Sequence, residues 1–286
     1  MLFLTPAILM TARPAMAATM TLAIHQNTSA GAGYRRSLEG WARAGIKNVE
    51  ITNTLLDEFL KTDTLAAARR VISDHGLTVV SGACGVTGIW EPNAGRAAAL
   101  DNFKKRCEQF KALGLTRTYS PTTASGTYTA GDYKAGAANM HEVGEIARGC
   151  GLAMTVEAVR ASTFISTLPT LLRMTRAAAH PSVAPLLDFY HFWSGLNKLE
   201  DLDLIRPGEI GHVHFQDVPD VPRETLDNTT RIIPGDGVAP LDAMLRKLLP
   251  AVPCFCNNCR SFSGSWISTL QNRCVTAEIF SSDSSV

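Results

Sequence analysis

Between residues 152 and 188, LAMTV (152–156) and APLLD (184–188) flank TLPTLLRMTRAA (167–178). The two outer segments are short apolar runs of strand length, and the middle segment carries apolar residues at helical spacing. A strand, a helix and a second strand in this order form a βαβ unit, which places two parallel strands side by side. The same alternation continues in both directions along the chain.

Seven strands can be predicted between residues 20 and 249, at 20–25, 47–52, 77–82, 116–120, 152–156, 184–188 and 209–215. Helical patterns lie between them, at 37–44, 64–75, 95–113, 133–149 and 167–178. Several end at a glycine that favours a left-handed cap, namely Gly45, Gly76, Gly114 and Gly151. With an eighth strand expected near residue 255, the pattern predicts an α/β fold of the (β/α)8 TIM barrel class, its eighth βα unit atypical or incomplete.

Composition excludes several classes of protein. The chain has 286 residues, 45% hydrophobic and 19% charged, with 27 basic against 26 acidic side chains for a net charge of +1. These values predict a globular protein with a sizeable core. Without a basic excess, we expect no nucleic-acid partner, and without an apolar run of about 18 residues we expect no membrane partner.

The two ends of the chain differ from its body. Residues 1–18 resemble a signal peptide, with an apolar stretch and a small-x-small site at Ala15-Met16-Ala17, but no Lys or Arg precedes them. This favours an exported or periplasmic protein; the alternative is a cytoplasmic protein that starts at Met20. The barrel is expected over 19–249. Residues 250–286 form an atypical tail rich in Cys and Ser, in which only Cys256 and Cys259 have the C-x2-C spacing of a structural zinc site.

Polar residues stand at the carboxyl ends of three consecutive predicted strands, where TIM barrels build their sites. Strand five is followed by Glu157, strand six ends at Asp188, and strand seven contains His212 and His214. Alternation along the strand does not decide between the two histidines. Carboxylates with one histidine suit Mn²⁺, Mg²⁺ or Co²⁺, and Zn²⁺ stays an alternative. The competing interpretation is that each is an ordinary polar group at a strand end.

Four motifs carry a resemblance to a known family: VEAV (156–159), LLDFYHF (186–192), GHVHFQDV (211–218) and RIIPGDGVAPLDAML (231–245). Together they resemble the xylose isomerase-like barrel superfamily, in its sugar isomerase and epimerase branch, over about residues 20–249.

The resemblance implies a site. It makes Glu157, Asp188 and His214 ligands of one divalent ion, with Mn²⁺ favoured. A fourth ligand should be a glutamate on strand eight; Glu278 is the only later carboxylate in a strand-like setting, and it comes some 20 residues late. His191 and Arg231 would contact the sugar. Glu50 lies where the family often has a polar residue at the rim, although a purely structural role fits equally well. His25 and Trp90 are similarly placed.

The implied activity is isomerisation or epimerisation of a small sugar or keto sugar through an enediolate, with Glu157 as one of two bases. A lyase acting on keto sugars by dehydration or deglycosidation uses the same intermediate. A catalytically impaired barrel that lacks the strand-eight glutamate is a further alternative. The endonuclease of the same barrel is disfavoured, because Thr229-Thr230-Arg231 stands where its zinc site needs Asp-x-His. The oligomeric state stays open, a homo-oligomer included.

Overall fold

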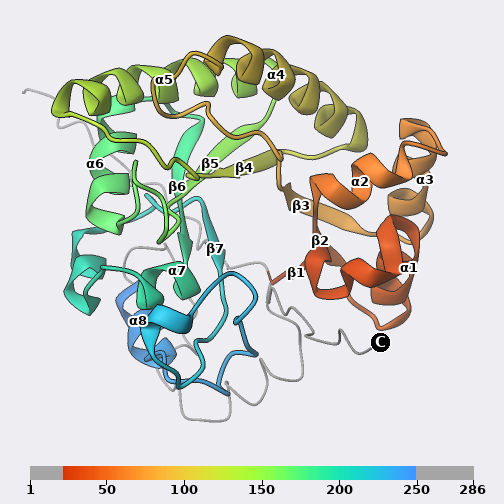
Figure 1. The fold of residues 1–286 in the computed structure, drawn as a ribbon. Helices are drawn as coiled ribbons and strands as arrows, with labels where there is room; N and C mark the ends of the chain where they lie inside the picture. Colours follow the sequence, from red (N-terminus) through yellow and green to blue (C-terminus); the bar gives the residue numbers. More distant parts are fainter. Residues whose placement is uncertain (1–21, 249–286) are drawn as a thin grey trace, which may run out of the picture.

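A computed structural model describes residues 22–248 as parallel strands surrounded by helices (Figure 1). The strands are β1 (Ile24–His25), β2 (Asn48–Ile51), β3 (Thr78–Gly82), β4 (Arg117–Pro121), β5 (Ala153–Glu157), β6 (Val183–Asp188) and β7 (His212–His214). The α-helices are α1 (Gly33–Arg43), α2 (Asn53–Phe59), α3 (Leu65–Asp74), α4 (Arg96–Leu113), α5 (Ala130–Gly149), α6 (Leu168–Ala178), α7 (Phe189–Ser194) and α8 (Leu241–Leu248). Three 3-10 segments, η1 (Gln26–Ala32), η2 (Leu199–Leu204) and η3 (Arg223–Thr225), complete the order. The predicted α/β barrel is confirmed.

The strands form two parallel sheets in chain order, β1-β2-β3 and β4-β5-β6-β7. An isolated parallel bridge between Ala83 and Tyr119 connects β3 to β4. Within residues 22–248, no strand lies between β7 and β1. The predicted eighth strand lies outside these residues, as do the signal-like segment and the atypical tail, so all three stay predictions.

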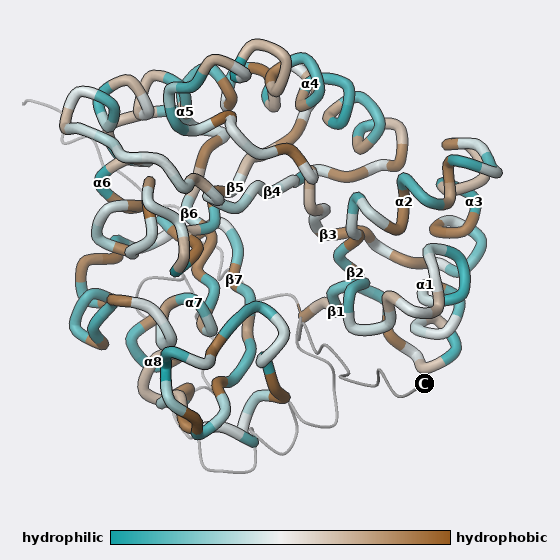
Figure 2. Tube along the Cα trace, in the orientation of Figure 1, coloured by the Kyte–Doolittle hydropathy of each residue, from teal (hydrophilic) through white to brown (hydrophobic). Residues whose placement is uncertain are grey.

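The helices cover the outside of the barrel because each has one apolar face. In α4, the buried side chains Phe103, Cys107, Phe110 and Leu113 recur every three or four residues, so they form one stripe. Figure 2 shows the corresponding alternation of hydrophilic and hydrophobic stretches along α4 and α5. No helix in the described part of the chain is long and apolar enough to span a membrane.

The predicted glycine caps are confirmed. Gly45, Gly76, Gly114 and Gly151 all have positive φ, between 61° and 88°. The helical patterns, however, missed α2 and α7. Both are short and begin directly at a strand end, so they offer too few residues for a helical period to show. Among the described residues, β1 covers only 24–25 of the predicted strand 20–25, and β7 covers only 212–214 of the predicted strand 209–215.

The barrel interior is unusually polar. Glu50 of β2 and His212 of β7 meet at 3.0 Å although their strands are not neighbours, so both side chains face the interior. His25 of β1 and Tyr119 of β4 likewise meet at 3.1 Å. Branched aliphatic side chains fill most barrels of this class. Here polar inward residues alternate with apolar outward ones, which points to a site inside the barrel rather than only on its rim.

Candidate metal and substrate site

The three predicted metal ligands come from consecutive strands of one sheet. Glu157 is the last residue of β5, Asp188 of β6 and His214 of β7. Asp188 and His214 are direct partners in the β6-β7 register. Because the strands are parallel, all three side chains emerge at the same end of the barrel.

These side chains converge. The Nδ1 atom of His214 lies 2.9 Å from Oε1 of Glu157 and 3.6 Å from Oδ2 of Asp188. All three residues are buried. Ligand atoms that share one ion at about 2.0–2.2 Å stand roughly 3.0–3.5 Å apart, so the distances of His214 Nδ1 from the two carboxylates are close to those around a shared divalent cation. The fourth predicted ligand, Glu278, lies outside the described residues.

Of the two histidines of β7, His214 is the one that contacts Glu157 and Asp188. His212 instead lies against Glu50, whose Oε2 atom is 3.0 Å from Nε2 of His212 and 3.4 Å from Nε2 of His214. Glu50 is fully buried. Burial alone would raise the pKa of Glu50, but the charges and hydrogen bonds of the two histidines hold it well below its usual value.

The His214 imidazole therefore lies between carboxylates on both edges. Burial lowers the pKa of His214, but the charges of Glu50 and Glu157 outweigh it and raise that pKa well above its usual value. In the absence of an ion, this shift favours the charged imidazolium, which donates from Nδ1 to Glu157 and has Nε2 3.4 Å from Oε2 of Glu50. A proton on Nδ1 of His214 would therefore compete with a metal ion for this nitrogen.

Arg231, a predicted substrate contact, reaches the same site from the loop that follows β7. Its guanidinium donates to Oδ2 of Asp188 at 2.8 Å, to Oε1 of Gln216 at 2.6 Å and to Nε2 of His191 at 3.0 Å. It also lies over the ring of Tyr190, 4.6 Å from the centroid. Since an arginine only donates, Nε2 of His191 is the acceptor in this contact.

Asp188 organises this side of the site. Its Oδ1 accepts a hydrogen bond from the backbone N–H of His191 at 2.7 Å, which caps α7 and turns His191 back toward the strand end. Burial would raise the pKa of Asp188, but the Arg231 guanidinium holds it well below its usual value. The structure thus brings Glu157, Asp188, His191, His214 and Arg231 together, as predicted.

Two other predicted neighbours have different surroundings. The His25 ring is fully buried, accepts from the backbone N–H of Asn27 at Nδ1 and contacts the hydroxyl of Tyr119 through Nε2. Trp90 is also fully buried, in the core, so in this conformation it is packed rather than exposed as a wall for a sugar ring.

Sequence reasoning missed the role of Asp217. Its buried carboxylate accepts four backbone hydrogen bonds, from Val218 at 2.8 Å, Gly235 at 2.9 Å, Gly237 at 3.1 Å and Ala239 at 3.0 Å. These four bonds fold the PGDG segment (residues 234–237) back against the end of β7. The segment follows Arg231 closely in the chain. An aspartate before a loop with two closely spaced glycines was the available signal.

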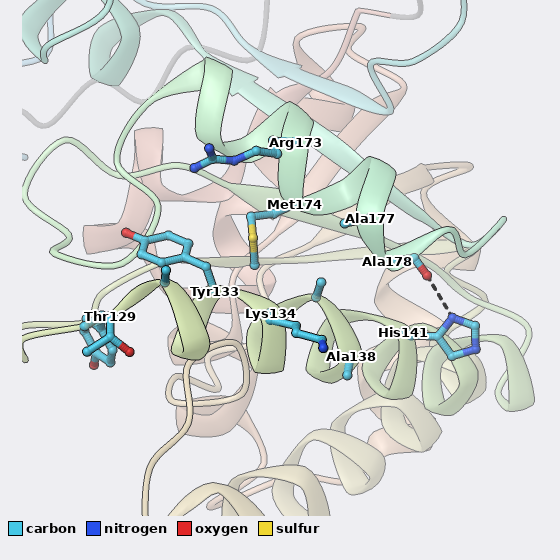
Figure 3. A pocket seen from close by; sticks show the side chains of 12 residues that line it. Thr129, Tyr133, Lys134, Ala138, His141, Arg173, Met174, Ala177 and Ala178 are labelled. Atoms are coloured by element: carbon cyan, nitrogen blue, oxygen red, sulfur yellow. Dashed lines mark hydrogen bonds between the residues drawn. The ribbon is translucent and has the colours of Figure 1, made fainter.

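A separate surface groove lies on the outside of the barrel between α5 and α6 (Figure 3). Its lining includes Tyr133, Lys134, His141, Arg173 and Met174, but no carboxylate or cysteine. It contains none of the predicted site residues and offers only one metal-ligating type of side chain, so the strand ends remain the candidate site.

Fold and site together define an α/β barrel with a cluster of candidate divalent-metal ligands at the carboxyl ends of its strands. The family model of the xylose isomerase-like TIM barrel matches residues 38–251. The chain therefore belongs to that family.

Its relatives are distant. An inosose isomerase from Halalkalibacterium halodurans is 24% identical over 214 residues, which are 73% of this chain and 76% of that protein. The solved structure of the IolI protein with a bound zinc atom superposes with a TM-score of 0.75 at 21% identity, covering 88% of this chain and 96% of that one. A D-allulose 3-epimerase from Methylomonas sp. superposes with a TM-score of 0.61 at 19% identity, covering 82% of each chain.

Proposed function

We propose that the chain is a divalent-metal-dependent isomerase or epimerase of a small sugar or keto sugar, acting through an enediolate. The observation that carries the proposal is that carboxylate oxygens of Glu157 and Asp188 both lie within 3.6 Å of the His214 Nδ1 atom. The buried Arg231 pairs with Asp188 beside them. Similarity to an inosose isomerase and to a D-allulose 3-epimerase supports this class of activity.

Glu157, Asp188 and His214 would hold the ion, and Glu278 is proposed as the fourth ligand. A bound divalent cation would supply Lewis-acid polarisation of a substrate carbonyl and its neighbouring hydroxyl. Two carboxylate oxygens with one imidazole nitrogen favour Mn²⁺, although the zinc atom in IolI makes Zn²⁺ the first competitor to test.

The proton chemistry falls to Glu157. Its carboxylate is buried at the end of β5, where it can take the proton from the carbon next to a carbonyl. His191 and the guanidinium of Arg231 lie beside Asp188, so they would orient the sugar's oxygens. The low exposure of all four side chains would keep bulk water away from the carbanion-like intermediate.

Hydrogen exchange into substrate carbon tests this function directly. The protein, loaded with Mn²⁺ or Zn²⁺, is incubated with a panel of keto sugars and inososes in D2O, and products are analysed by NMR. We expect deuterium at the carbon next to the carbonyl together with inverted or isomerised product. A Glu157→Gln variant should lose about 10²–10⁴-fold in rate.

The matched control is Glu142→Gln, which removes an exposed carboxylate of α5 that pairs with Arg96 at 2.7 Å, away from the strand ends. It should retain full activity. Elimination products in place of exchange would assign the lyase, and a loaded protein without exchange on any substrate would indicate an impaired barrel. Equal metal affinity in wild type and Glu278→Ala would remove Glu278 as the fourth ligand.

A further inference from the structure

Glu50 sits on the far edge of the proposed ligand His214. The imidazole turns Nδ1 toward Glu157 at 2.9 Å and Asp188 at 3.6 Å, and it turns Nε2 toward Oε2 of Glu50 at 3.4 Å. The structure assigns Glu50 a positioning role: its carboxylate fixes the ring and the tautomer of His214, so that the Nδ1 lone pair faces the two ligand carboxylates. This inference rests on the metal site of the proposed function.

The chemistry of imidazole requires such a partner. A neutral imidazole has one N–H and one lone pair. If Nδ1 is to bind a cation, the single proton must lie on Nε2, which is buried inside the barrel and needs an acceptor. Metal-binding histidines commonly donate that proton to a carboxylate, which orients the ring and raises its basicity. Of the groups that the structure places near Nε2 of His214, Glu50 is the carboxylate at hand.

The position of Glu50 is built into the fold. A register shift between Val49 and Glu50 places Glu50 opposite Ser81 of β3, and its side chain crosses the interior to β7. The extra residue at this shift, Val80, lies on β3, so β2 keeps its alternation and Glu50 faces the interior between the outward-facing Val49 and Ile51. The carboxylate is fully buried and is anchored by His212, whose Nε2 lies 3.0 Å from the same Oε2 atom. His212 therefore fixes the position of the Glu50 carboxylate, and this carboxylate in turn orients the His214 ring.

The same side chains could in principle be a separate metal site. Donor atoms of Glu50, His212 and His214 lie within 4.8 Å of one another. An ion on Nε2 of His214 in addition to one on Nδ1 would, however, require the ring to lose both of its protons. A single ion with Glu50 as hydrogen-bond acceptor needs no such imidazolate, so we favour the positioning role and let stoichiometry test the alternative.

The experiment compares wild type with Glu50→Gln, which keeps the shape of the side chain and removes its charge. Zinc affinity is measured by competition with a chromophoric chelator, and zinc stoichiometry by elemental analysis. We expect one ion per chain in wild type and an affinity about 10–100-fold weaker in Glu50→Gln. The control is Glu145→Gln, which removes the charge of a carboxylate on α5 that lies 2.8 Å from Nε2 of His180, just before β6. It should leave the affinity unchanged.

A second readout uses the wild-type protein and does not depend on the variant folding. In the zinc-loaded protein, ¹⁵N NMR of the histidine rings should show His214 ligated at Nδ1 and protonated at Nε2. Ligation at Nε2 would overturn the inference, as would a Glu50→Gln affinity within threefold of wild type or the loss of one of two bound ions. Absence of zinc binding by wild type would instead contradict the proposed function.

Discussion

The two sheets of the barrel contribute differently to the site. The four-stranded sheet, β4 to β7, supplies all three proposed ligands from neighbouring strands in continuous register. The three-stranded sheet, β1 to β3, supplies none of the three, and its register shifts between Val49 and Glu50. It contributes Glu50 and His25, which lie against residues of the other sheet.

The difference separates two tasks. Regular pairing brings strand ends together, so the four-stranded sheet gathers the charged groups. The irregular sheet reaches across the interior and fixes the orientation of a side chain that the other sheet provides. Each charge is also balanced differently, since Asp188 pairs with the guanidinium of Arg231 and Glu50 pairs with imidazoles.

The largest loss of stability is expected when the buried ion pair between Asp188 of the four-stranded sheet and Arg231 is broken. Asp188→Ala should lower the free energy of unfolding by about 3–5 kcal/mol, because it leaves the buried guanidinium of Arg231 without its carboxylate partner. Urea denaturation measures the change. The double variant Asp188→Ala with Arg231→Leu should recover part of the loss, since it removes the uncompensated charge.

The control for this prediction is an exposed pair. Asp242→Ala removes the partner of Arg246 at 2.8 Å on α8, where both side chains are 52% exposed. Its cost should stay within about 1 kcal/mol. Equal costs at the two positions would show that burial does not distinguish the pairs, and no recovery in the double variant would show that the uncompensated charge is not the cause.

A smaller effect is expected at Asp217, which shapes the loop beyond β7. Asp217→Asn turns an N–H group toward backbone donors, so the free energy of unfolding should fall by roughly 2–3 kcal/mol. Gly237→Ala should act on the same loop, because its Cβ would lie 2.5 Å from Oδ1 of Asp217. Asp132→Asn, at the exposed capping box of α5, is the control and should cost about 1 kcal/mol or less. A cost at Asp217 no larger than this would mean that its four contacts do not hold the loop.

The pH dependence of metal binding compares the charges of both sheets at one imidazole. Glu50 from one sheet and Glu157 from the other raise the pKa of His214, so the ion-free ring is protonated at neutral pH. Binding must release that proton. At pH values below the raised pKa of His214, zinc affinity should therefore increase about tenfold for each unit by which the pH is raised.

Calorimetry in two buffers of different ionisation enthalpy measures the released protons. We expect about one proton per ion at pH 7. Binding without proton release at pH 7 would contradict a protonated His214, and would show that the carboxylates of the two sheets do not act together on this ring.

Much of this arrangement could be predicted from sequence, for reasons that differ by residue. Glu157, Asp188 and His214 end predictable strands, and parallel strands bring their ends together. Strand alternation could not choose between His212 and His214, because both face the interior; only the family resemblance favoured His214, and in the structure their contacts with Glu50 and Glu157 separate them.

The contacts of Glu50 could not be predicted either. They join residues 162 positions apart across the interior of the barrel, and no local periodicity encodes which side chains meet there. The same holds for Asp217, whose backbone contacts depend on how a loop folds back. Side chains that act within their own strand pattern are thus accessible from sequence, whereas those that act across the barrel require the structure.

The smallest effect is expected at the contact between the tyrosine hydroxyl of one sheet and a histidine of the other. Tyr119 of β4 places its hydroxyl 3.1 Å from Nε2 of His25 of β1, and both rings pack edge to face against His214. Tyr119→Phe keeps the ring packing and removes one hydrogen bond, so the free energy of unfolding should fall by about 0.5–1.5 kcal/mol. The matched control is Tyr34→Phe, which removes a 3.3 Å hydrogen bond from the Tyr34 hydroxyl of α1 to the backbone carbonyl of Ala68 in α3. This bond does not join the two sheets. Zinc affinity should stay within about threefold in both variants, because the charged contacts of His214 remain. A tenfold loss confined to Tyr119→Phe would show that neutral contacts across the barrel position the ligand as strongly as Glu50 does.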